Sequence, residues 1–287
     1  MRPPYPVIDA HVHVAPWDRV RPEAAALAAA GRDDFEAVRE LCRDPHRLVA
    51  YLDERNIEQV VMVNYITPEV IGFTEEVNAF SARIARAYPH RLIPYGGVDP
   101  RLHADVAAHM DYLLGDLRLR GIKIHPPHQL FSANAYVHDD SLRGLATVYE
   151  KCIEHRVPVM FHTGTSVFPR ARNKFGDPMD LDDVLVDFPE LTAIIAHGGR
   201  PLWMDTVLFL LRRWRNAYLD ISGIPPKNLL LYFPWLERFA DRSMFGSDWP
   251  GPMVMDMGKN VEDFYALPLA EDVKRKILRE TALALYG

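Results

Sequence analysis

The sequence has few cysteines, no excess of basic residues and no long hydrophobic run. Its 287 residues include only two cysteines, Cys42 and Cys152, which lie far apart and lack metal-ligand spacing. We interpret both as free thiols of a protein in a reducing compartment. The 33 lysines and arginines are outnumbered by 39 aspartates and glutamates, which gives a formal net charge of −6. This balance argues against nucleic-acid binding.

Signals for export or membrane insertion are also lacking. The first residues, Met-Arg-Pro-Pro-Tyr-Pro, contain no apolar segment typical of a signal peptide, and no hydrophobic run approaches the length of a membrane span. We therefore expect a cytoplasmic protein without membrane contact. A hydrophobic content of 48% and a charged content of 25% are typical of a soluble chain that buries a full core.

What the sequence does contain is a regular alternation of strand and helix patterns. Short apolar segments predict eight strands, at 6–14, 59–64, 92–98, 121–125, 157–162, 191–197, 217–222 and 243–248. Amphipathic segments predict helices at 45–55, 74–88, 103–117, 140–155, 181–188, 203–214, 226–240 and 269–286. This α/β alternation predicts a distorted (β/α)8 TIM barrel. An open, doubly wound sheet could use the same alternation, but no Gly-x-Gly-x-x-Gly follows the first strand.

The absence of linkers and of breaks in composition predicts one domain over residues 1–287. Its main irregularity is a long segment at about 15–44, between the first strand and the next clear helix. Long connections in compact domains usually carry small elements of their own or serve function. We expect a short helix and loop inserted over one end of the barrel.

Polar residues are concentrated at the predicted strand ends, where barrel enzymes place their active sites. His11 and His13 lie two residues apart in the first strand and therefore share one face. Two neutral imidazoles held this way form half of a metal site. Further strands end at His125, His162, His197 and Asp248. Packing alone explains such a set poorly, because each buried imidazole needs a partner.

Five motifs at these strand ends carry a resemblance to a known family. They are Asp-Ala-His-Val-His, Gly-Ile-Lys-Ile-His-Pro, Phe-His-Thr-Gly, Ile-Ala-His-Gly-Gly and Phe-Gly-Ser-Asp-Trp-Pro. In this order they resemble the amidohydrolase-related (amidohydrolase 2) branch of the amidohydrolase superfamily, over nearly the whole chain. That branch includes metal-dependent hydrolases and non-oxidative decarboxylases such as aminocarboxymuconate semialdehyde decarboxylase.

The resemblance implies one divalent metal ion, zinc, with His11, His13, His162 and Asp248 as its ligands. Three imidazoles and a carboxylate suit zinc, which lowers the pKa of a bound water to about 7. The resemblance implies two catalytic residues: Asp248, which carries the proton, and His197, at the edge of the ligand shell, which orients the water or polarises the scissile group.

Lys123 stands where superfamily members with two metals often have a carboxylated lysine. We interpret Lys123 as an unmodified lysine that lines the pocket or pairs with an acid, and a carbamate that bridges two metals is the alternative. The residues that we expect to bind a small, anionic substrate are His125, Lys123, Arg170, Arg172, Arg200 and Trp249. Arginine suits bidentate binding of a carboxylate, although charged loops are often only solvated. His125 equally fits a structural histidine.

Three further residues near the strand ends fit supporting roles. Asp9 is interpreted as a buried hydrogen-bond acceptor or as a support for a metal ligand. Asp220 and Ser222 are expected to organise the rim of the site.

These observations favour a metal-dependent hydrolase that uses activated water on a carboxylate-bearing ester, lactone or amide. Three alternatives stay open. The same site could catalyse non-oxidative decarboxylation of an unsaturated or aromatic acid, or hydration of a dicarboxylate, or the barrel could bind metal without catalysis. Many relatives are dimers, so a homodimer is possible. The substrate is not determined by the motifs, because loops set specificity on this fold.

Overall fold

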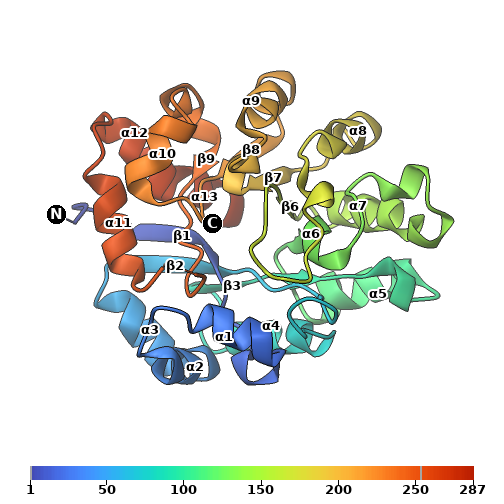
Figure 1. Ribbon diagram of the computed structural model, residues 1–287, viewed down its shortest axis with the longest axis horizontal. Helices are drawn as coiled ribbons and strands as arrows, with labels where there is room; N and C mark the ends of the chain where they lie inside the picture. Colours follow the sequence, from blue (N-terminus) through green and yellow to red (C-terminus); the bar gives the residue numbers. More distant parts are fainter. Residues whose placement is uncertain (1, 253) are drawn as a thin grey trace.

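Parallel strands surrounded by helices make up the computed structural model, which describes residues 2–252 and 254–287 (Figure 1). Three strands pair in the order β1-β2-β3 and six in the order β4-β5-β6-β7-β8-β9. The first three are β1 (Val7–Val12), β2 (Ile57–Met62) and β3 (Leu92–Pro94). The others are β4 (Gly96–Gly97), β5 (Ile122–Ile124), β6 (Val159–His162), β7 (Ala193–Ala196), β8 (Ala217–Asp220) and β9 (Ser243–Met244). All strand pairs are parallel.

Backbone hydrogen bonds join the two sheets into one ring. Only Tyr95 separates β3 from β4, and its amide donates to the Met62 carbonyl of β2 at 3.1 Å. On the other side, the Ala10 amide of β1 donates to the Phe245 carbonyl at 2.8 Å. If β3 and β4 are counted as one broken strand, the ring has eight strands. The predicted (β/α)8 barrel is therefore confirmed.

Helices follow the strands, as the alternation predicts. They are α3 (Pro45–Asp53), α4 (Glu76–Ala85), α5 (Val106–Asp111), α7 (Gly144–Glu154), α8 (Asp180–Asp187), α9 (Met204–Arg213), α10 (Pro226–Tyr232), α11 (Met257–Tyr265), α12 (Glu271–Arg275) and α13 (Thr281–Tyr286). Helix α3 begins as expected, because the Asp44 carboxylate accepts from the amides of His46 and Arg47 ahead of Pro45 at the first position. Helix α11 is an element that the sequence patterns did not predict.

The inserted segment after β1 is more helical than expected. It contains α1 (Pro22–Ala28) and α2 (Phe35–Arg43) in place of one short helix. Helix α2 packs against α3 and α1 lies on the α4 side of it (Figure 1), and Trp17 at the start of the insertion is buried against Phe35 and Phe73. The insertion covers the end of the barrel at which the strand-end histidines lie, since Trp17 and Ala28 line the cavity there.

The opposite end of the ring is closed by α13. Tyr286 of this helix is buried and its hydroxyl bonds the Tyr95 hydroxyl at 2.7 Å. Tyr286 and Ala282 belong to a buried cluster with Ile8, Met160 and Met244 of the strands. In the part of the chain that the structure describes, no helix is both long and apolar enough to cross a membrane.

Candidate metal and active site

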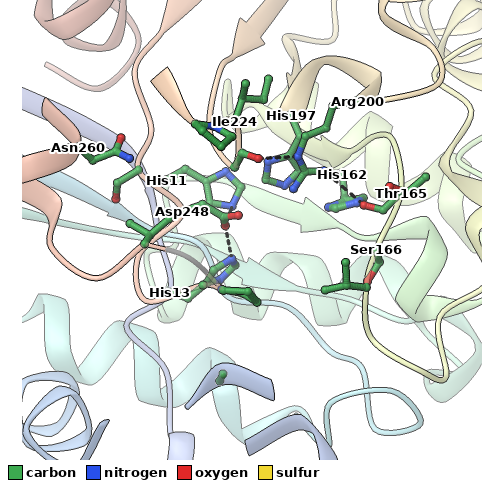
Figure 2. A pocket seen from close by; sticks show the side chains of 18 of the residues that line it. His11, His13, His162, Thr165, Ser166, His197, Arg200, Ile224, Asp248 and Asn260 are labelled. Carbon is green, nitrogen blue, oxygen red and sulfur yellow. Dashed lines mark hydrogen bonds and ion pairs between the residues drawn. The ribbon is translucent and has the colours of Figure 1, made fainter. Parts of the chain in front are cut away.

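Closure of the barrel places the first strand-end motif beside the last. The Asp248 amide donates to the His11 carbonyl at 2.8 Å, and the His13 amide donates to the Trp249 carbonyl at 2.6 Å. The two imidazoles and the Asp248 carboxylate therefore meet on one side of the β1–β9 seam, where Figure 2 shows them pointing toward one another.

The hydrogen bonds of His11 and His13 leave both Nε2 lone pairs facing a carboxylate. His11 Nδ1 lies 2.5 Å from Asp220 Oδ2, and His13 Nδ1 lies 2.7 Å from the Val63 carbonyl, so each Nδ1 carries the donated proton. Asp248 Oδ1 then lies 3.6 Å from His11 Nε2 and 3.1 Å from His13 Nε2. With neutral imidazoles these three acceptor atoms would repel one another. A divalent cation satisfies all three at once, so the donor set fits a metal ion.

His162 and His197 face the same space from the neighbouring strands β6 and β7. Their ring centres are 4.6 Å apart, and His197 lies 4.9 Å from His11 (Figure 2). Donor atoms of His11, His197 and Asp248 all lie within 4.8 Å of one another. Among the described residues, the buried Nε2 of His162 has no hydrogen-bond partner, as expected for an atom that awaits a ligand. The structure therefore places His197 in the donor cluster itself.

The electrostatics of the site keep these groups in the protonation states that a metal needs. Burial, reinforced by nearby positive charge, lowers the pKa of His11, His162 and His197 well below the usual value. Burial raises the pKa of Asp248, but the positive charge nearby, including that of Arg200, lowers it by more. His11, His162 and His197 are therefore neutral and Asp248 is a carboxylate at neutral pH.

Two of these residues have strained backbones. His197 has φ of 64° and Asp248 has φ of 67°, in the left-handed region that non-glycine residues rarely adopt. Such conformations persist only where the surroundings hold them, and they gather at functional sites. The turn at each strand end aims the side chain toward the site instead of along the strand.

Asp220, Ser222 and Asp9 hold the donor residues in place. Asp220, fully buried, bonds His11 Nδ1 and also accepts from the amide and hydroxyl of Ser222, at 2.9 Å each. The Ser222 carbonyl lies 3.0 Å from His197 Nδ1 and fixes that ring. Asp9 accepts from the amides of His11 and Ser247. The buried Asp9 carboxyl thus accepts hydrogen bonds from backbone amides, whereas Asp220 bonds the His11 ring and orients it directly.

Lys123 and His125, on and just after β5, lie at the floor of the site. Lys123 is fully buried, its amine has no hydrogen-bond partner among the described residues, and burial lowers its pKa. His125 stacks between His162 and His128, at ring distances of 3.7 and 3.6 Å. Both line the cavity, as expected.

His128 is a cavity residue that the sequence reasoning missed. Its Nδ1 lies 3.0 Å from the Tyr65 hydroxyl and its Nε2 lies 2.6 Å from Ser166 Oγ. The spacing His125-x-x-His128 on a helical turn (α6, Pro126–Gln129) is the signal that could have found it, since residues three apart share a face. Tyr65 and Ser166 lie in loops after different strands, and no sequence spacing links either of them to His128.

The basic and aromatic candidates divide into two groups. Arg200 lines the cavity, where its Nε donates to the Gly223 carbonyl at 2.7 Å and its Nη1 to the Thr165 carbonyl at 3.3 Å. Arg170 and Arg172 do not reach the cavity, contrary to expectation: Arg170 pairs with Glu23 of α1 at 3.2 Å and Arg172 is exposed. Trp249 also differs from expectation, because it is 1% exposed and stacks on Tyr51 behind the site.

The cavity above these groups has a volume of about 820 Å³. Aromatic side chains form much of its wall, namely Trp17, Tyr65, Phe73 and Phe168. The space is large enough for a small organic molecule. It combines a polar, metal-fitting floor with apolar sides and one arginine.

Comparison with known families shows what this arrangement belongs to. Residues 8–287 match the family model described as amidohydrolase. No protein with a curated description matches the sequence.

Solved structures show the same fold. An uncharacterised TIM-barrel protein from Bordetella bronchiseptica is 25% identical, with a TM-score of 0.73 and 98% of this chain and 99% of that chain covered. The 5-carboxyvanillate decarboxylase of Sphingomonas paucimobilis is 16% identical, with a TM-score of 0.62 and 98% of each chain covered. The 4-oxalomesaconate hydratase of Rhodopseudomonas palustris is 17% identical, with a TM-score of 0.63 and coverage of 98% and 95%.

Proposed function

The chain belongs to the amidohydrolase family, and from this premise we propose that it is a metal-dependent decarboxylase of a small unsaturated or aromatic carboxylic acid. The observation that carries the proposal is the position of Arg200. It brings one guanidinium to an aromatic-walled cavity whose floor is the His11, His13 and Asp248 donor set. Structural neighbours that decarboxylate 5-carboxyvanillate and 2,6-dihydroxybenzoate support the same reaction class.

We assign the metal to His11, His13, His162 and Asp248. His197 lies in the same donor cluster, and we place it beside the ion as the residue that orients water. A bound divalent ion would supply Lewis-acid activation of the substrate and of water. Zinc suits this donor set, and one structural neighbour, a 5-carboxyvanillate decarboxylase, is described with manganese.

Substrate binding and proton transfer would be carried out by side chains of the protein. Arg200 binds the anionic end of the substrate, and the aromatic walls hold its flat body and exclude water. As the bond between the carboxylate and its carbon breaks, carbon dioxide leaves and the electron pair stays on that carbon. Asp248, which has taken a proton from water with His197 nearby, delivers that proton to the carbon, and the hydroxide left from the water combines with the carbon dioxide to give bicarbonate.

Hydrolysis of an ester, lactone or amide is the second candidate, favoured by the ionised state of Asp248. A carboxylate next to a neutral His197 imidazole can take a proton from water and then protonate a leaving group. Both reactions use the same residues, so the products distinguish them.

The test is product analysis with purified protein loaded with zinc or manganese. A panel of hydroxybenzoic and unsaturated dicarboxylic acids is assayed for carbon dioxide, and a matched panel of esters, lactones and amides for released acid. Carbon dioxide release that Asp248→Asn abolishes supports the decarboxylase. Turnover of the ester panel alone, equally lost in Asp248→Asn, would replace it with the hydrolase.

A further inference from the structure

A second cluster of metal-ligand residues lies outside the barrel site. Glu75 immediately precedes α4, His103 follows the short 3-10 helix at Pro100–Leu102, and His109 lies in α5. One ligand atom of each of the three residues lies within 4.8 Å of the others. None of the three is among the residues that line the main cavity.

The cluster is unsatisfied as it stands. Glu75 Oε1 bonds His103 Nε2 and lies 3.8 Å from His109 Nε2. The two imidazoles stack with ring centres 3.6 Å apart, and the Nε2 atoms of both lie near the same Glu75 oxygen. In the part of the chain that the structure describes, His109 Nε2 is buried without a hydrogen-bond partner. A buried polar atom left unpaired costs stability, and a cation bound by all three side chains removes that cost.

The chemistry of the cluster selects the ion. Two imidazoles and one carboxylate suit zinc better than calcium or magnesium, which prefer oxygen ligands. Burial, followed by the charge of His103, lowers the pKa of His109, so its lone pair is available at neutral pH. The Glu75 side chain is 41% exposed, which leaves room for water to complete the coordination.

We propose that Glu75, His103 and His109 form a second, structural zinc site that joins the start of α4 to α5. This site is independent of the reaction proposed for the barrel. Because these residues belong to successive strand–helix units, the ion would tie two neighbouring parts of the outer layer together. At a zinc concentration about 100 times its dissociation constant, we expect the site to raise the melting temperature by about 4 to 8 °C.

The test is zinc titration of metal-stripped protein, with His109→Ala and Glu75→Gln as variants and His138→Ala, which changes an exposed histidine, as the control. We expect two zinc ions per chain with dissociation constants below about 10 µM in the wild type and in His138→Ala, and one in His109→Ala and Glu75→Gln. Zinc-edge anomalous scattering should show density at the cluster in the wild type and in His138→Ala, and none there in His109→Ala or Glu75→Gln.

Two results would overturn the proposal. One is a wild-type protein that shows no zinc at the cluster, or that fills the cluster only above 1 mM zinc. The other is a second ion that remains in both variants. Circular dichroism checks that the variants are folded, and Glu75→Gln keeps the size of the side chain, so that loss of zinc in both reports on the ligands.

Discussion

The hydrogen bond between Asp220 and His11 offers a sharp test of the proposed metal site. Asp220 Oδ2 lies 2.5 Å from His11 Nδ1, in a fully buried position, and so fixes the tautomer that turns the His11 Nε2 lone pair toward Asp248. Asp220→Asn keeps the shape of the side chain. Its oxygen can still accept from the Ser222 amide, which now bonds Oδ1 at 2.9 Å. The amide NH₂ then faces His11 Nδ1, where one donor opposes another.

The variant therefore has two outcomes for His11, and both weaken metal binding. Either the ring keeps its tautomer without a partner, or the proton moves to Nε2 and blocks the lone pair. Loss of a partner of this kind lowers metal affinity about 10- to 100-fold, which corresponds to about 1.4 to 2.7 kcal/mol. We expect that loss in Asp220→Asn.

The assay is competition for zinc between metal-stripped protein and a chromophoric chelator, in a His109→Ala background so that only the barrel site is titrated. Asp187→Asn is the matched control, because Asp187 accepts a hydrogen bond from Tyr136 on the surface. Equal melting temperatures of the metal-free proteins would show that the fold is kept. A zinc affinity of Asp220→Asn within about twofold of that control would refute the reasoning.

Three further predictions concern the same site. Asp248→Asn should abolish turnover while leaving the circular dichroism spectrum unchanged, and full activity would exclude Asp248 as the proton carrier. Gly223→Ala should lower kcat/KM, measured by steady-state kinetics, about 100-fold. The added Cβ would lie 2.6 Å from Arg200 Nη2 and 2.8 Å from Asp248 Oδ2, and the backbone φ of +65° disfavours alanine. Burial raises the pKa of the Asp9 carboxyl from 3.8 to about 7. In the metal-free protein this carboxyl is therefore protonated at a higher pH in the folded state than in the unfolded chain. The free energy of unfolding then falls as pH rises from about 4 to 7. Urea unfolding should show this loss, at most about 4 kcal/mol, as a steeper fall of stability with pH in the wild type than in Asp9→Asn, where the raised pKa values of Asp220 and Asp180 still contribute; equal slopes in the two would contradict it.

The barrel could be predicted from the sequence because its strands are short, continuous apolar runs. Gln59–Val60–Val61 is recognisable as a buried strand wherever the rest of the chain lies. The broken strand at Tyr95 could not be predicted, since it depends on pairing with β2 on one side and β5 on the other. The two helices of the insertion were also underestimated, because α2 packs its apolar face against residues distant in sequence.

The site residues at strand ends could be located in advance for a simple reason. Barrel geometry brings every strand end to one rim, so His11, His162 and Asp248 must lie near one another whatever the loops do. Loop residues obey no such rule. Arg170 and Arg200 look alike in sequence, yet one pairs with Glu23 outside the cavity and the other is held inside it by the Gly223 carbonyl. Only the path of each loop separates them.

The most direct test of the proposed site is a crystal structure of the zinc-loaded protein with anomalous data at the zinc edge. We expect one peak inside the barrel, bonded to His11, His13, His162 and Asp248, with Lys123 unmodified. Two peaks bridged by a carboxylated Lys123, or no peak among these side chains, would contradict it.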